Sequence, residues 1–150
     1  MNFTHTSIVI AVDDAGSSGR ALDYGLEMAE ALQLPVRIVH VASLQDPHRT
    51  DYQQLDLEHI SQAAGGMPEL ELGAALLDRA MERAGERQIE MEPVLLGGEP
   101  TDALLRFLDE CDKPMLFVGR RGQSRLRELI LGSVSDKLVR HARCPVFVIS

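Results

Sequence analysis

The stretch PMLFVGRRGQSRLRELILGSVSDKLVRHARCPVFVIS, residues 114–150, decides the fold. It begins and ends with a short apolar run, Pro114 to Gly119 and Pro145 to Ser150, and both runs are typical of buried strands. Between the two runs, apolar residues recur at helical spacing: Val134, Leu138 and Ala142. Two buried strands with a helix between them indicate a parallel sheet, because parallel strands need a long crossover connection.

The same alternation extends back to the N-terminus. Three further apolar, β-branched runs predict strands: Ser7 to Asp13, Pro35 to Ser43 and Glu90 to Gly98. The helical stripes that follow them are Ala21, Leu22, Gly25, Leu26, Ala29 and Leu32; Leu70, Ala74, Leu77, Met81 and Ala84; and Leu104, Leu105, Leu108 and Cys111. Four βα units and a final strand predict an α/β fold: one doubly wound, five-stranded parallel sheet, Rossmann-like, with helices on both faces.

Polar residues indicate where the helices begin. Ser17 or Ser18 is expected before the first helix, and Thr101 after Pro100 before the third. Ser133, with Asp136 three residues further on, has the spacing of a capping box before the fourth. Residues 44–68 are polar, irregular and too long for an ordinary connection, so we expect a mobile insert there, with a short helix over Asp51 to Ser61.

Composition limits the classes of function. The chain has 150 residues, 45% of them apolar, and a net charge of −8, which suits one domain and argues against a nucleic-acid backbone as the main partner. No apolar run approaches the ~20 residues that span a bilayer, and no signal peptide is recognisable, so we expect a cytoplasmic protein. Cys111 and Cys144 lack a C-x-x-C spacing and are expected to be buried small hydrophobes. His40 lies within a predicted strand and is expected to be a packed core residue.

The glycine-rich segment after the fourth strand carries the pattern G-x-x-G-x9-G-S, formed by Gly119, Gly122, Gly132 and Ser133. Glycines let backbone N–H groups approach a bulky anion, and a helix that starts at Ser133 presents further N–H groups and its positive dipole end. These features favour a phosphate cradle. Four arginines add positive charge nearby: Arg120, Arg121, Arg125 and Arg127. The alternative is an ordinary turn with a helix cap and a solvated basic face.

Asp13 ends the first predicted strand. In an open α/β sheet, ligands bind beyond the carboxyl ends of the strands, where the winding reverses. If the first strand neighbours the fourth, Asp13 and Gly119 both open onto that crevice. The Asp13 carboxylate would then accept hydrogen bonds from ribose hydroxyls or an amino group. The alternative, which Asp14 shares, is a loop carboxylate that caps the first helix.

Three segments resemble the universal stress protein family, specifically its ATP-binding branch. They are IVIAVDDAGSSGRALDYGLEMAEAL (residues 8–32), GGEPTDALLRFLDECD (97–112) and GRRGQSRLRELILGSVSDKLVRHARCPVFVIS (119–150), and the resemblance covers nearly the whole chain. It implies the adenine nucleotide alpha hydrolase-like form of the fold, and a stress-response protein that binds ATP, AMP or ADP. It also implies a homodimer formed through the final strand, Pro145 to Ile149.

The resemblance assigns roles by residue. Asp13 would contact the adenosine, Val41 would offer backbone groups to the adenine edge, and Val118 and Gly119 would line the ribose. Four residues would hold the phosphates: Gly122, Gly132, Ser133 and Val134. The sequence departs from the family at Asp14 and Ala15, where D-G-S or D-x-S is usual, and at Arg120, where a small or polar residue is usual.

No motif supplies a catalytic base or an attacking nucleophile, so we expect a binding protein with at most slow ATP hydrolysis. Mg²⁺ or Mn²⁺ would enter with the phosphates, coordinated mainly by them and by water. Two alternatives remain open: a dimeric interaction module of the same fold with an empty crevice, and a weak ATPase or nucleotidyl-transfer enzyme.

Overall fold

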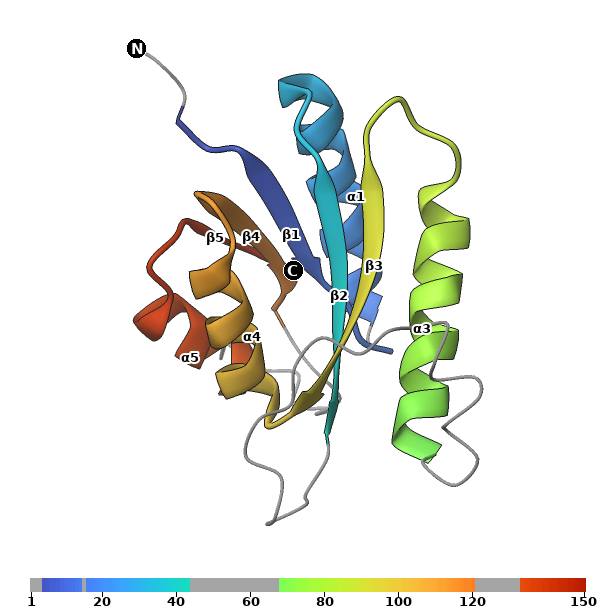
Figure 1. Ribbon diagram of the computed structural model, residues 1–150, viewed down its shortest axis with the longest axis vertical. Helices are drawn as coiled ribbons and strands as arrows, with labels where there is room; N and C mark the ends of the chain where they lie inside the picture. Colours follow the sequence, from blue (N-terminus) through green and yellow to red (C-terminus); the bar gives the residue numbers. More distant parts are fainter. Residues whose placement is uncertain (1–3, 15, 44–67, 121–132) are drawn as a thin grey trace.

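The computed structural model describes residues 4–14, 16–43, 68–120 and 133–150 (Figure 1). Strands and helices alternate along these residues in the order β1 (Ser7–Ala11), α1 (Gly16–Leu32), β2 (Val36–Ser43), α3 (Pro68–Ala84), β3 (Met91–Gly98), α4 (Pro100–Glu110), β4 (Pro114–Gly119), α5 (Ser133–His141) and β5 (Val146–Ile149). The predicted alternation is therefore confirmed. The expected insert, except for Pro68 at the start of α3, lies outside the described residues, as does the short helix predicted within it.

The five strands form one sheet in the order β3-β2-β1-β4-β5, and every neighbouring pair is parallel. From β1 the chain first builds outward through β2 to β3, then returns to the other side of β1 to place β4 and β5. The winding thus reverses between β1 and β4, as a doubly wound sheet requires. The predicted fold class is confirmed.

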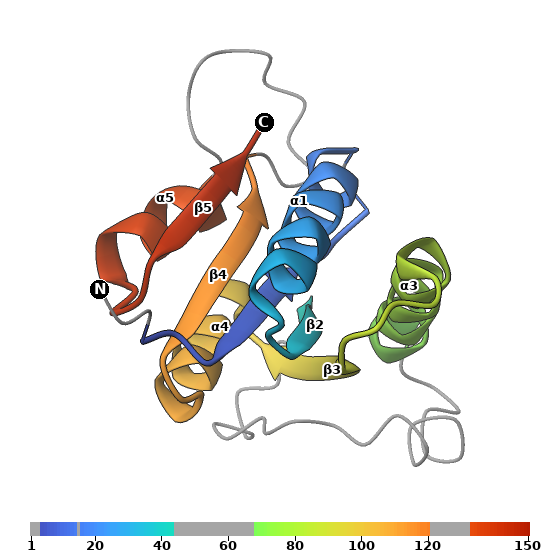
Figure 2. The same ribbon diagram turned by 90° about the horizontal axis from the view of Figure 1, so that it is seen from above.

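The helices cover both faces of the sheet, α1 and α3 on one side and α4 and α5 on the other (Figure 2). Successive residues of a strand point to opposite faces. Along β1, Ile8 and Ile10 pack into the core beneath α1 and α3, whereas Val9 packs into the core beneath α4 and α5. All three side chains are fully buried, which explains why the strand is continuously apolar rather than alternating.

Gly25 lets α1 lie close to the sheet. A Cβ atom at this position would lie 2.6 Å from Cδ1 of Ile10 and 3.3 Å from Cγ of Phe117. Both of those side chains are buried, on β1 and β4. Packing therefore explains why Gly25 lies in the middle of a helix, although glycine is unfavourable in a helix interior.

Two of the predicted helix starts are wrong, because both helices begin earlier than expected. Helix α1 begins at Gly16, before Ser17 and Ser18, and the Ser18 hydroxyl accepts a hydrogen bond from the Asp13 N–H at 2.8 Å. Helix α4 begins at Pro100, whose missing N–H is harmless at a first helical position. Its cap is Glu99, whose carboxylate accepts from the Asp102 N–H at 2.8 Å, while Thr101 is buried inside the helix. Helix α5 begins at Ser133, so this serine is the first residue of the helix and not a cap before it.

Candidate functional site

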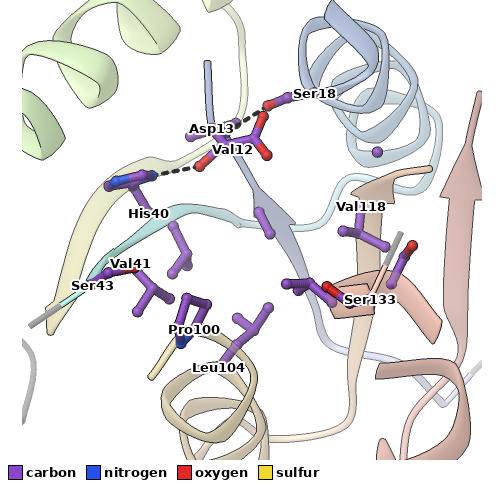
Figure 3. A pocket seen from close by; sticks show the side chains of 15 residues that line it. Val12, Asp13, Ser18, His40, Val41, Ser43, Pro100, Leu104, Val118 and Ser133 are labelled. Carbon is purple, nitrogen blue, oxygen red and sulfur yellow. Dashed lines mark hydrogen bonds between the residues drawn. The ribbon is translucent and has the colours of Figure 1, made fainter. Parts of the chain in front are cut away.

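A cavity of about 300 Å³ opens at the carboxyl ends of β1, β2 and β4 (Figure 3). The first turns of α4 and α5 complete its walls. The volume is at the lower end of the range found for small-ligand pockets. The cavity therefore occupies the point of the fold where the winding reverses, as predicted for a ligand site.

The structure brings together six of the eight predicted site residues. Those that line the cavity are Asp13, Val41, Val118, Gly119, Ser133 and Val134. They come from four segments that are far apart in the sequence. Because β1 pairs with β4 in parallel, with Ile10 opposite Phe117, the carboxyl ends of these two strands lie at the same edge of the sheet and open onto the same space. Gly122 and Gly132 lie outside the described residues.

Apolar side chains form much of the cavity wall. Val39 and Val41 contribute from β2, and Pro100 and Leu104 from the first turns of α4. Sequence reasoning did not identify Pro100 and Leu104 as site residues, although it recognised the G-x-P segment to which Pro100 belongs. Apolar surface with a few polar groups at its edge is the usual lining of a site for a flat, partly apolar ligand such as a nucleobase.

The expectation that His40 is simply a packed core residue is wrong. His40 lines the cavity, is only partly buried, and its Nδ1 lies 2.7 Å from the Val12 carbonyl oxygen. Ser18 and Ser43 also line the cavity and were likewise not predicted to do so. No residue pattern within β2 indicated that the side chain of His40 lies at the cavity.

The N-terminal turn of α5 faces the cavity with Ser133, which is exposed, and Val134, which is half-buried. Its next residue, Ser135, is buried and donates a hydrogen bond of 2.9 Å to the Arg120 carbonyl. A helix start presents N–H groups without partners in the helix and a partial positive charge, both of which suit an anion. Of the four nearby arginines, Arg120 is half-buried and the other three lie outside the described residues.

Other candidate chemistry is sparse in the described part of the chain. There, no group of three or more His, Cys, Asp or Glu side chains is placed to hold a metal ion. Nor is any described helix long and apolar enough to cross a membrane. Cys111 is buried and burial raises the pKa of its thiol, while Cys144 is only partly buried, and both are free thiols. These thiols lie in the core beneath α4 and α5 rather than in the cavity wall.

Comparison with known proteins agrees with this fold. The model of the universal stress protein family matches residues 5–150. Universal stress protein YxiE of Bacillus subtilis is 30% identical over 145 residues, which are 95% of this chain and 97% of the relative.

Two solved structures of universal stress proteins superpose on nearly the whole chain. One, from Archaeoglobus fulgidus in complex with dAMP, is 25% identical with a TM-score of 0.69 and covers 99% of this chain and 100% of its own. The other, in complex with cAMP, is 26% identical with a TM-score of 0.67 and covers 99% of both chains. With the family model matched across almost the full length, this chain belongs to the universal stress protein family.

Proposed function

We propose that this protein binds an adenine nucleotide, ATP or AMP, in the cavity at the carboxyl ends of β1, β2 and β4, and acts as a nucleotide-dependent regulatory protein in a stress response. The observation that carries the proposal is the convergence of Asp13, Val41, Gly119 and Ser133 on one cavity at the reversal of the winding. Further support is that two related proteins of known structure hold adenine nucleotides, dAMP and cAMP.

Each part of the cavity suits one part of the nucleotide. The base would lie against the apolar wall of Val39 and Leu104, with its polar edge toward the backbone of Val41. The Asp13 carboxylate would accept hydrogen bonds from the ribose hydroxyls. Gly119 has no side chain to obstruct the sugar.

The phosphates would lie at the start of α5. The Ser133 hydroxyl and the N–H groups of the first helical turn would donate to the phosphate oxygens. Gly122 and Gly132 would contribute backbone N–H groups from the segment between β4 and α5. A divalent cation, Mg²⁺ or Mn²⁺, would bring charge neutralisation to a triphosphate, coordinated mainly by phosphate oxygens and water. ATP hydrolysis is expected to be slow, since phosphoryl transfer also needs an oriented nucleophile.

Isothermal titration calorimetry on nucleotide-free protein tests the proposal, with ATP, ADP and AMP as ligands and GTP as the control for the base. The variant Asp13→Asn should bind AMP about 10- to 100-fold more weakly, because a hydrogen bond to a charged group contributes roughly 1.5–3 kcal/mol. Asp14→Asn is the matched control: Asp14 is exposed and is not part of the cavity wall, so affinity should stay near the wild-type value.

The result that would overturn the proposal is the absence of heat with every adenine nucleotide in protein free of copurified ligand. That result would favour an interaction module of the same fold. Turnover of labelled ATP that is fast and abolished by Ser133→Ala would instead favour an enzyme.

We also propose that two copies pair through β5. It is the edge strand next to β4, and Phe147 on it remains 37% exposed although its ring stacks on Phe117 at 4.6 Å between centroids. An apolar edge strand that stays unpaired invites uncontrolled association, so pairing with a second copy is a physically reasonable use of it.

A further inference from the structure

The hydrogen bonds of the sheet end just after β1, at the peptide that joins Val12 to Asp13. Strand β1 ends at Ala11, but the Val12 N–H still donates to the Val39 carbonyl of β2 at 2.8 Å. The next peptide unit joins Val12 to Asp13 and lies beyond the ladder. Its carbonyl and its N–H must find other partners, because unpaired backbone groups are costly away from water.

Side chains hold both polar groups of that peptide. The Val12 carbonyl accepts a hydrogen bond from Nδ1 of His40 at 2.7 Å, and the Asp13 N–H donates to the Ser18 hydroxyl at 2.8 Å. Figure 3 shows the two side chains reaching the peptide from different elements, His40 from β2 and Ser18 from α1. Since a carbonyl oxygen can only accept, the His40 proton must be on Nδ1.

Both partners are themselves held in place. Ser18 is only 4% exposed, within the first turn of α1. His40 pairs in register with Leu95 of β3, and Gly73 of α3 lies behind its ring: a Cβ atom on Gly73 would be 3.0 Å from Cδ2 of His40. The ring therefore has little room to turn away from the Val12 carbonyl.

We infer that His40 and Ser18 are positioning residues for Asp13. By fixing the Val12–Asp13 peptide at both of its polar groups, they fix the direction in which the Asp13 side chain leaves the backbone at the cavity wall. A carboxylate held in place before the ligand arrives loses less conformational freedom on binding, which improves affinity. The inference rests on the proposed function for the ligand, an adenine nucleotide, and extends it to two residues that need not touch that ligand's ribose.

The first test is made on the free protein. Ser18→Ala should increase the hydrogen-exchange rate of the Asp13 amide by roughly tenfold or more, because the amide loses its acceptor. Ser18→Thr, which keeps the hydroxyl, should restore slow exchange. In the wild-type protein, long-range ¹H–¹⁵N correlation should find the His40 proton on Nδ1. Unchanged exchange in Ser18→Ala, or a His40 proton on Nε2 alone, would overturn the inference whether or not a nucleotide binds.

The second test measures AMP affinity by calorimetry. His40→Leu and Ser18→Ala should each weaken binding about 5- to 30-fold, and His40→Asn should recover most of the loss, because its amide nitrogen can donate from near the position of Nδ1. In an Asp13→Ala background the same two substitutions should have little further effect, since they act through Asp13. Leu77→Ala, at a fully buried position on α3 outside the cavity wall, is the control for destabilisation alone and should leave affinity unchanged.

Losses of equal size with and without Asp13 would refute the inference, because they would indicate a general structural role. If the wild-type protein binds no nucleotide, the proposed function fails and the effect on ligand affinity fails with it. The amide exchange of Asp13 would still decide whether the two side chains hold the peptide.

Discussion

The hydroxyl of Ser135 donates a hydrogen bond of 2.9 Å to the carbonyl of Arg120, 15 residues earlier in the chain. Arg120 follows the last residue of β4, and its own N–H donates to the Ile149 carbonyl of β5 at 2.7 Å. Ser135 is 2% exposed, so its bond is shielded from water. The start of α5 is therefore held against the end of β4, and both of these segments border the proposed nucleotide site.

Two serines on the same helix should separate stability from binding. Ser135→Ala removes the buried donor to Arg120 and should lower the free energy of unfolding by about 1–3 kcal/mol, as expected when a buried partner is left unsatisfied. Ser133→Ala changes an exposed residue at the cavity wall and should leave stability within ~0.5 kcal/mol while weakening AMP binding.

Urea denaturation measures the first effect and calorimetry the second. If the Ser133→Ala variant binds AMP as tightly as the wild-type protein does, the Ser133 hydroxyl does not contact the phosphate. If both variants lose the same unfolding free energy, the loss comes from a general weakening of the first turn of α5 and not from the Ser135 hydrogen bond.

Gly25→Ala should destabilise the protein although alanine is the better helix former. The added Cβ would lie 2.6 Å from Cδ1 and 2.7 Å from Cγ1 of Ile10, whose side chain is fully buried. Overpacking of this kind costs about 1–3 kcal/mol, against a helix-propensity gain of about 1 kcal/mol, so a net loss of roughly 1–2 kcal/mol is expected in urea denaturation.

Two further variants check that cause. Gly16→Ala makes the same change at the start of the same helix, where nothing lies within 4 Å of the new Cβ, and should not destabilise. Ile10→Ala removes both the Cδ1 and the Cγ1 atoms that the new Cβ would meet, so the double variant Gly25→Ala/Ile10→Ala should be more stable than the sum of the two single effects predicts. Additive effects would show that the close approach is not the source of the loss.

The fold was predictable because both signals that define it are local. Strands buried on both faces are continuously apolar, as in Ile8 to Ile10, and the helices between them keep a 3.6-residue stripe. Rules of connection then leave few ways to assemble such units, and the β1–β4 pairing that places Asp13 beside Gly119 is one of them.

What could not be predicted depends on contacts between distant residues. His40 lies within β2, and only the folded chain places its ring beside the Val12 carbonyl, 28 residues away. The serines before the first helix were interpreted as helix caps, yet Ser18 accepts from the Asp13 N–H from inside α1. Side-chain partners for backbone groups at a strand end leave no periodic signal in the sequence.

Acid should weaken the link between α1 and α3. Arg83 donates to both carboxylate oxygens of Asp23, at 3.0 and 2.6 Å, and this hydrogen bonding lowers the pKa of Asp23 below its ordinary value of 3.8. A carboxyl whose pKa is lower in the folded state stabilises the protein above its unfolded pKa, and the stabilisation disappears as the pH falls through the folded pKa. Both side chains are about half exposed, so the contribution is at most about 1 kcal/mol.

Urea denaturation of the wild-type protein and of Asp23→Asn, from pH 7 down to about pH 3, tests this. The difference in unfolding free energy should be largest near neutral pH, should begin to decrease near about pH 4, and should disappear as the pH falls through the lowered pKa of Asp23. With Arg83→Gln present in both proteins, the difference should become small and nearly independent of pH. If the difference in unfolding free energy between wild type and Asp23→Asn does not change with pH while Arg83 is present, the ion pair does not cause the pH dependence.

Pairing of two copies through β5 should depend on backbone groups at its outer edge. The Pro145 carbonyl accepts from the Leu116 N–H of β4, and the Ile149 carbonyl accepts from the N–H of Arg120, which follows β4. Since backbone groups alternate in direction along a strand, Val148 presents its N–H away from β4, toward a second copy. Val148→Pro removes that donor and leaves the bonds to β4 in place, as proline is tolerated on an edge strand.

Sedimentation velocity should find the wild-type protein as a dimer and Val148→Pro as a folded monomer with a similar far-ultraviolet circular dichroism spectrum. Phe147→Pro is the contrasting variant: by the same alternation its N–H faces β4, so the substitution should destabilise the sheet itself. A wild-type protein that stays monomeric at high concentration would refute pairing through β5. If Val148→Pro dimerises as tightly as the wild-type protein, the interface must lie on another surface. Without the Val148 N–H, β5 cannot form the same hydrogen bonds with a second copy.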